Sequence, residues 1–216
     1  MAGVRIPLFP LHVVLFPSAA LPLHVFEQRY RTMMVDVLAA PEPAFGVVGI
    51  REGYEVGARA ETHDVGCLAI VEHSERHADG TTDLLVRGSN RFRIEVRPDD
   101  DPYPQADVVV LDEPEGPRAS EAMRLARAAL ERYAIVVAQT ARHAPVPIAL
   151  SDDPVAASYE AASALAVDLP LLQQLIEAAS AAERLARVAS IARAEASLLD
   201  VIGAPLRAGI RPASLN

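Results

Sequence analysis

The stretch IPLFPLHVVLFPSAALPLHVFEQRYR, residues 6–31, decides the fold that we expect for this chain. Its four prolines each fix φ and remove a backbone N–H donor, so a continuous helix cannot form there. From Phe26 the pattern changes, because apolar side chains recur at helical spacing as far as Leu38. The stretch therefore predicts a strand, a turn, a second strand and an amphipathic helix that ends near Ala40.

The rest of the first half reads as further strands. Apolar runs over residues 44–50 and 63–77 have the length and branching of buried strands. The dipeptide Asp79-Gly80 is a strong hairpin signal and joins the second run to a strand over 82–86. We expect the last strand over residues 103–111.

Between these strands, residues 87–90 have the composition of a turn and are followed by a strictly alternating strand. Alternation predicts Phe92, Ile94 and Val96 on the inward side. The outward side would then carry the only basic stripe of this half, made of Arg91, Arg93 and Arg97. Such a stripe is either a face that recognises an anionic or extended partner or a solvated surface whose charge is offset by nearby acids.

The second half reads as helical. Residues 114–117, Pro-Glu-Gly-Pro, mark a boundary between a β subdomain over 1–113 and a helical bundle subdomain over 118–200. Helix starts are signalled by an aspartate cap at Asp153 and a capping box from Ser180 to Glu183. Residues 203–216 are expected to be a flexible tail. The fold class predicted is α+β.

Bulk composition narrows the class of protein. A chain of 216 residues with 51% hydrophobic and 23% charged residues has enough apolar surface for a core. No apolar run approaches the ~20 residues that a membrane span needs, and the N-terminus lacks a signal-peptide pattern. The single cysteine, Cys67, cannot form an internal disulfide. We therefore expect a cytoplasmic protein that does not act at a membrane.

Charge excludes further classes. The net charge is −9, with 17 acidic residues against 10 arginines up to Asp112 and 12 against 10 afterwards. A nucleic-acid binder needs a concentrated basic surface, so we expect no nucleic-acid partner. All 20 basic residues are arginine, which excludes the lysine-dependent chemistry of a P-loop. We expect no enzyme activity and no cofactor.

Four potential metal ligands, His63, Cys67, His73 and His77, are spaced so that one continuous strand would place them on the same face. On one strand, however, ligands four residues apart would lie roughly 13 Å apart, whereas zinc ligands lie about 2.0–2.3 Å from the metal. We therefore expect surface histidines and a buried thiol rather than a metal site.

A series of short motifs follows in order along the first half: PLFPL (7–11), LFP (15–17), LPLHVFE (21–27), VGCLAIV (65–71), LVRGSNRFRI (85–94) and YPQADV (103–108). This series resembles the N-terminal substrate-binding domain of Lon proteases, and more closely the bacterial proteins that consist of this domain alone. The helical half resembles the family chiefly at 168–175 and 182–199.

The resemblance implies a PUA-like, partly open β barrel followed by a helical bundle, without the ATPase or the serine–lysine protease that full-length Lon enzymes carry. It also implies a function, the binding of unfolded or extended protein segments, with an adaptor role beside a separate Lon protease as a further hypothesis. A small-molecule sensor that uses the barrel cleft and, less favoured, an RNA-binding protein of the PUA-like kind are the alternatives. The residues that we expect to contact a protein partner are Glu27, Gln28, Arg29, Met33, Arg91 and Arg93.

Overall fold

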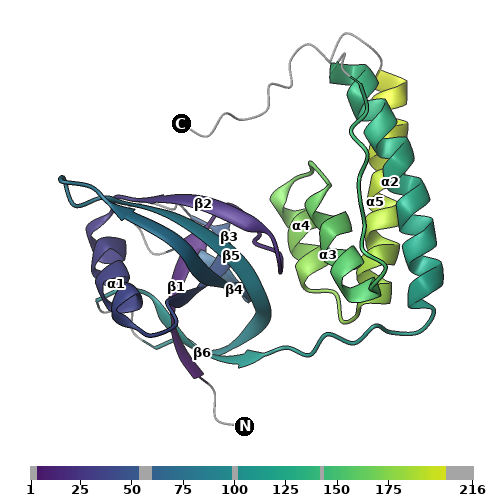
Figure 1. Cartoon of the computed structure of the whole chain (residues 1–216). Coiled ribbons are helices and arrows are strands. Elements are labelled where there is room, and N and C mark those ends of the chain that lie inside the picture. Colours follow the sequence, from purple (N-terminus) through teal and green to yellow (C-terminus); the bar gives the residue numbers. More distant parts are fainter. Residues whose placement is uncertain (1–3, 54–59, 99–101, 142–143, 203–216) are drawn as a thin grey trace. The chain divides into compact units, whose positions relative to one another are not determined.

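The computed structural model describes residues 4–53, 60–98, 102–141 and 144–202. Two compact units make up the chain (Figure 1). The sheet unit comprises Met1–Asp112 and Val167–Glu177, and the helical unit comprises Glu113–Ala166 and Ala178–Asn216. A mixed sheet combined with helices confirms the α+β class.

Six strands form the sheet, in the order β2-β5-β4-β3-β1-β6. Because β6 also pairs with β5, the pairings of β5, β4, β3, β1 and β6 close into a ring that leaves β2 at an edge. Among the strand pairs of the described residues, only β1–β3 is parallel. The strands span Val4–Leu11 (β1), Ala20–Val25 (β2), Ala44–Glu52 (β3), Glu61–Arg76 (β4), Thr82–Val96 (β5) and Gln105–Val110 (β6).

The proline-rich opening forms the predicted strand, turn, strand and helix, as β1, β2 and α1 (Gln28–Ala39). The first half of β1 pairs with β6 and the second half with β3, so one short strand joins two parts of the sheet. Our expectation that the helical pattern begins at Phe26 is wrong. Phe26 precedes α1 and is 51% exposed, because the chain is still extended at Glu27, the N-cap residue.

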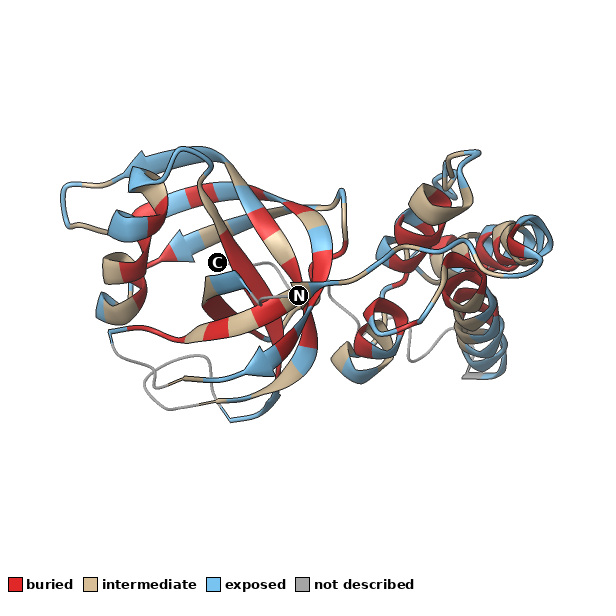
Figure 2. Ribbon diagram, turned by 90° about the horizontal axis from the view of Figure 1, so that it is seen from below, coloured by how far each residue is buried: buried red, intermediate tan, exposed pale blue. Residues whose placement is uncertain are grey.

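The core of the sheet unit is formed by buried residues of the strands, which appear as red segments along the ribbon in Figure 2. Gly46 makes this packing possible, since a Cβ there would lie 2.8 Å from the side chains of Ile6, Leu8 and Phe92. One cluster in this core consists of Leu8, Val48, Phe92, Ile94, Ala106 and Val108.

β5 runs without a break through residues 87–90, so the turn predicted there is wrong. The pairing of β5 with β4 shifts at this point, because β5 advances three residues from Gly88 to Arg91 while β4 advances two. The turn-forming residues therefore form a bulge within a strand. Val96 is also not on an inward face as predicted, since it is 54% exposed near the end of the strand.

Helix α4 (Leu169–Ile176) belongs to the sheet unit, although it lies within the range expected for the helical subdomain. Two buried side chains hold it against the strands. Gln173 Nε2 donates to the carbonyl of Val65 at 3.1 Å, and Arg91 Nη1 donates to the carbonyl of Ile176 at 2.6 Å. Arg91 is only 2% exposed, so our prediction that it lies on an outward basic stripe is wrong.

The helical unit is built from α2 (Ala119–Ala141), α3 (Pro154–Ser163) and α5 (Ala181–Ile202). The predicted cap of α3 is confirmed, because Asp153 accepts from the N–H of Ala156. The capping box of α5 is confirmed in part: Ser180 Oγ accepts from the N–H of Glu183, whereas the Glu183 carboxylate accepts from the N–H of Ala179. Arg184 is fully buried and joins α5 to α3, with Nη1 2.7 Å from Ser158 Oγ and its guanidinium over the ring of Tyr159. No helix in the described part of the chain has the length and apolar character needed to cross a membrane.

Candidate functional site

A cluster of exposed and partly exposed side chains lies where β2, the β4–β5 hairpin and the start of α1 meet. We call it the α1-start surface and define it by His24, Phe26, Gln28, His77 and Asp83. The register of β2 on β5 places His24 directly opposite Asp83. The bond from Gly88 N–H to the carbonyl of Ala19 makes this a non-hydrogen-bonded pair, the kind whose side chains approach most closely. Sheet register alone thus brings two polar residues 59 positions apart into contact.

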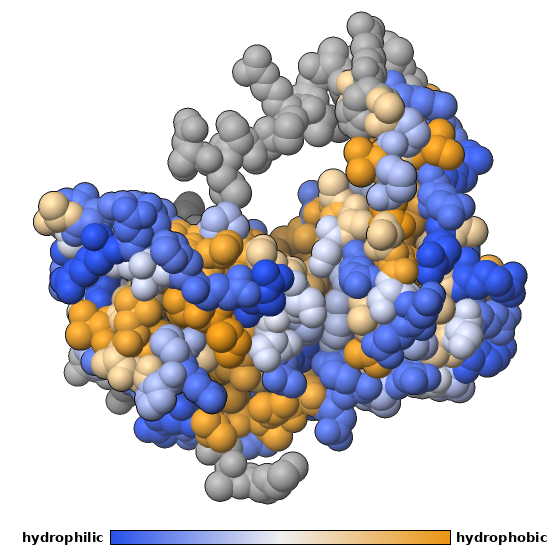
Figure 3. Space-filling view, viewed as in Figure 1, coloured by the Kyte–Doolittle hydropathy of each residue, from blue (hydrophilic) through white to orange (hydrophobic). Residues whose placement is uncertain are grey.

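Phe26 gives this surface its apolar component. The ring stacks on His24, with centroids 6.2 Å apart and planes 22° apart, and its other contacts leave half of the side chain in water. Hydrophobic patches are visible on the face of the sheet unit drawn in Figure 3. A large exposed aromatic beside polar groups is a feature of protein-binding surfaces, in which aromatic residues are enriched. The exposed large hydrophobic residues of this unit are Val4, Phe26, Val35, Ile70, Leu85, Val96 and Val110.

Asp83 organises the charges of the surface. Its Oδ1 lies 2.6 Å from His24 Nδ1, and its Oδ2 lies 2.7 Å from His77 Nε2. The hydrogen bonds from His24 and His77 lower the pKa of the Asp83 carboxyl. The hydrogen bond to Asp83 raises the pKa of the His77 imidazole, helped by the nearby charges of Asp83, Glu75 and Asp79. One carboxylate therefore orients two imidazoles at the surface.

The hairpin tip is fixed to the helix by Arg31. Arg31 Nη2 donates to the carbonyl of Asp79 at 3.2 Å. Gly80 has φ +84°, a conformation that favours glycine, and a Cβ at this position would collide with the Arg31 guanidinium. Asp79 also accepts from the N–H and the hydroxyl of Thr81. The Asp79-Gly80 signal thus gives the predicted hairpin, and it also lets α1 approach the hairpin closely.

Three of the expected contact residues, Glu27, Gln28 and Arg29, lie at the start of α1. Gln28 is exposed, as predicted. Glu27 and Arg29 are partly buried, because their side chains form an ion pair of 3.2 Å and the Arg29 guanidinium lies 4.6 Å from the centroid of the Tyr30 ring. The structure therefore brings these three residues beside Phe26 and leaves Gln28 as the most accessible of them.

The other three expected contact residues lie elsewhere. Met33 is fully buried in the core and Arg91 is buried beneath α4, so neither offers a side chain to a partner. Arg93 is exposed on β5 and makes no ion pair with any described residue. The basic stripe is not continuous, because Arg97 Nη1 binds Asp64 Oδ1 at 2.7 Å and Arg91 faces α4.

The side chains of the α1-start surface offer hydrogen-bonding and apolar groups. In the part of the chain that the structure describes, no group of three or more His, Cys, Asp or Glu side chains is arranged to hold a metal ion. His73 is exposed and Cys67 is buried, so these two of the four considered ligands lie in different environments. The surface combines an aromatic face, imidazoles and a carboxylate, groups that suit contacts with polypeptide.

A family model described as the ATP-dependent protease La (LON) substrate-binding domain matches residues 5–193. The chain belongs to this family. Curated relatives include the Lon protease of Azospirillum brasilense, 27% identical over 203 residues, and that of Roseiflexus castenholzii, 30% identical over 210 residues. These alignments cover 92% and 91% of this chain but 25% of each relative. The chain thus spans about a quarter of the length of these Lon proteases.

Solved structures of the Lon family share the fold. The crystal structure of a Lon N-terminal domain protein from Xanthomonas campestris has a TM-score of 0.60 and 22% identity, covering 87% of this chain and 98% of that one. The N-terminal domain of the Mycobacterium avium complex Lon protease also has a TM-score of 0.60, with 20% identity, covering 89% and 99%. These likenesses show the Lon N-domain fold in this chain.

Proposed function

We propose that this protein binds unfolded or extended segments of other proteins through the α1-start surface and that it does so without catalysis. Membership of the Lon substrate-binding domain family is the observation that carries the binding role. The position of Phe26, half exposed beside His24 and Gln28, supports this location. An exposed aromatic ring offers apolar contact to many sequences, which is what a tolerant site for unfolded chain requires.

A binding assay tests this function. A reduced, carboxymethylated and permanently unfolded model protein, labelled with a fluorophore, is titrated with the full chain, and anisotropy reports binding. We expect Phe26→Ala to weaken binding by about tenfold, because a truncated aromatic anchor typically costs more than 1 kcal/mol. The control Val110→Ala changes another half-exposed residue of the sheet unit, and binding should change less than about twofold.

The assay separates the function from its location. If the unfolded protein does not bind the wild-type chain, the proposed function fails. If the wild-type chain binds and Phe26→Ala binds equally well, the function stands and the α1-start surface is not its site. The folded state of each variant is checked by circular dichroism.

A separate Lon protease is the partner that an adaptor role would require. The 216 residues contain no lysine, which P-loop chemistry requires, so in a test of this role the added Lon enzyme supplies the motor and protease steps. With this chain added, a Lon enzyme should degrade a destabilised substrate faster, and Phe26→Ala should remove most of the gain. An unchanged degradation rate would contradict the adaptor role alone.

A small-molecule sensor is the second candidate, and a hollow of about 420 Å³ in the sheet unit favours it. Ser18, Arg87, Ser89 and Asn90 contribute polar groups to its lining, and its volume is within the range of about 300–1,000 Å³ that is usual for ligand sites. A thermal-shift screen of polar metabolites tests this candidate, and stabilisation that Asn90→Ala abolishes would support it.

A further inference from the structure

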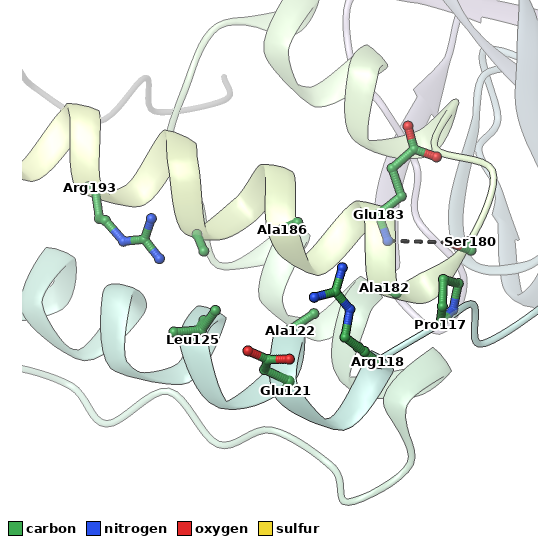
Figure 4. A pocket seen from close by; sticks show the side chains of 11 residues that line it. Pro117, Arg118, Glu121, Ala122, Leu125, Ser180, Ala182, Glu183, Ala186 and Arg193 are labelled. Carbon is green, nitrogen blue, oxygen red and sulfur yellow. Dashed lines mark hydrogen bonds between the residues drawn. The ribbon is translucent and has the colours of Figure 1, made fainter.

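The helical unit has an uncovered face between α2 and α5. α3 packs against both helices and meets α5 at the buried Arg184. One residue advances an α-helix by about 100°, so Ala182 and Ala186 lie on the side of α5 that is roughly opposite Arg184. On that side, a groove of about 450 Å³ runs between α5 and the start of α2 (Figure 4). No described element of the helical unit fills it.

The groove has a floor of small and apolar side chains. Ala122 of α2 lines the groove together with Ala182, Ala186 and Ala189 of α5. Leu125 also lines it and is 43% exposed. Small side chains allow the axes of packed helices to approach closely, and an exposed leucine beside them gives a third helix an apolar contact. The shape and composition of the floor therefore suit an amphipathic helix.

Unpaired positive charge marks the two ends of the groove. Arg118 lies near Ala182 and Arg193 lies at the far end (Figure 4). Neither arginine forms an ion pair with a described residue. Glu183 is already engaged, because it accepts from the N–H of Ala179 at 2.9 Å and pairs with Arg187 at 2.6 Å. Glu121 is the one other acidic residue of the lining. With Glu183 paired to Arg187, the two arginines outweigh the charge of Glu121, and the lining has a net positive charge.

We propose that this groove binds an amphipathic helix of a partner protein that carries two acidic residues about eleven positions apart. The spacing follows from the α5 positions 182 and 193, which lie roughly 16 Å apart along the helix axis. Residues 203–216 of the chain itself are unsuitable occupants, because they contain two arginines and no acidic side chain. The site lies in the helical unit and is independent of the α1-start surface.

Designed peptides test the groove. The probe is a fluorescein-labelled amphipathic helix of about 18 residues, built on alanine and leucine, with glutamates about eleven positions apart. Matched peptides carry glutamine or lysine at the same two positions. Each is titrated at low salt into the full wild-type chain, the double variant Arg118→Glu/Arg193→Glu, and the control Arg124→Glu, an exposed α2 residue outside the groove.

The glutamate peptide should bind the wild-type chain roughly five- to tenfold more tightly than the glutamine peptide, and added salt should reduce the difference. The double variant should lose this preference and favour the lysine peptide, whereas Arg124→Glu should keep the wild-type order. Equal binding of the three peptides, no binding at all, or the same loss in Arg124→Glu would overturn the proposal. Self-association of the chain that buries Leu125 and excludes the peptide would overturn it too, because the occupant would then be a second copy.

Discussion

At the scale of single residues, the three arginines of β5 and its C-terminal extension have three different environments. Arg91 is buried and donates to the carbonyls of Ile176 and Asp112, Arg93 is exposed, and Arg97 binds Asp64 and Thr62. Strand alternation predicts one outward face for all three. It cannot reveal that a helix about 80 residues downstream covers that face at Arg91.

Arg91 should therefore contribute to stability where Arg93 does not. Arg91→Met removes the hydrogen bonds to the buried carbonyl of Ile176 and to the carbonyl of Asp112, and we expect the free energy of unfolding to fall by about 2–3 kcal/mol. Arg93→Met, on the same strand, should change it by less than about 0.5 kcal/mol. Urea denaturation measures both, and hydrogen exchange should show α4 losing protection in Arg91→Met. Equal effects of the two changes would contradict this role of Arg91.

Arg184 gives a second prediction for the helical unit. Its guanidinium is fully buried, donates to Ser158 Oγ and lies 3.6 Å from Glu113 Oε2. Arg184→Met leaves Glu113 and Ser158 without this partner, so the unfolding free energy should fall by about 3 kcal/mol. Arg187→Met removes an i,i+4 pair with Glu183 and should cost about 0.3–0.5 kcal/mol. Chemical denaturation compares them, and a loss below that of Arg187→Met would argue against Arg184 as a structural anchor.

The pair of His77 and Asp83 predicts a pH dependence. Because the folded pKa of His77 is raised, its stabilising contribution is complete below the ordinary histidine pKa of about 6.5 and is lost as the pH rises through the folded value. Because the pKa of Asp83 is lowered, its contribution is present above the ordinary aspartate pKa and is lost in acid. The pair should stabilise the fold most near pH 5.

Urea denaturation of the wild-type chain and His77→Gln should therefore differ most near pH 5 and least near pH 8. His73→Gln changes an exposed histidine of β4 and should show no such difference. A gap between wild type and His77→Gln that is the same at both pH values would exclude the ion pair as its cause.

At the scale of elements, the strand β2 has an open edge, and a proline in this edge limits pairing with a further strand. Leu21 is hydrogen-bonded to Val86 in the alternating pattern, so the backbone nitrogen of Pro22 faces away from β5, towards the open edge. A proline there withholds the N–H donor that an added strand would need. Unfolded chain can bind to a protein as an extended peptide that adds a strand to a sheet edge. Pro22 disfavours this mode of binding at the β2 edge.

Pro22→Thr should supply a backbone N–H donor at the open edge of β2 and so favour pairing of this edge with a strand of another molecule. We expect the variant to elute earlier from a size-exclusion column as its concentration rises, while the wild-type chain does not shift. Pro7→Thr is the matched control, because Pro7 pairs with Gln105 inside the sheet. If Pro22→Thr and Pro7→Thr show the same elution behaviour, Pro22 does not protect the edge.

Local patterns predicted most elements, and the errors lie where tertiary structure overrides them. The prolines, the Asp79-Gly80 hairpin and the helix caps act over a few residues, so their signals are readable in the sequence. The helical pattern predicts a start at Phe26, whereas α1 begins at Gln28 because Glu27 is extended. Residues 87–90 have turn composition, yet pairing with β4 and β2 holds them in a bulged strand.

At the scale of the whole molecule, the candidate surface depends on contacts between residues far apart in sequence. The polar start of α1 was predicted from helical spacing, and Gln28 is exposed there. The contact of His77 with Asp83 could be predicted from the sequence, because a hairpin centred on Asp79-Gly80 places the two residues near each other. His24 could not be assigned to this cluster, since its contact with Asp83 depends on how β2 pairs with β5. The burial of Arg91 by α4 could not be predicted from the sequence either, because it depends on a contact between residues 85 positions apart.

Hydrogen exchange measured by mass spectrometry tests the central claim most directly. The full chain is labelled with and without a saturating amount of the permanently unfolded model protein. Our account predicts added protection in peptides that cover residues 24–31 and 77–83, and less added protection there in Phe26→Ala at the same concentration of the unfolded protein. Binding that leaves these segments unchanged and protects other strands or helices instead would contradict the account.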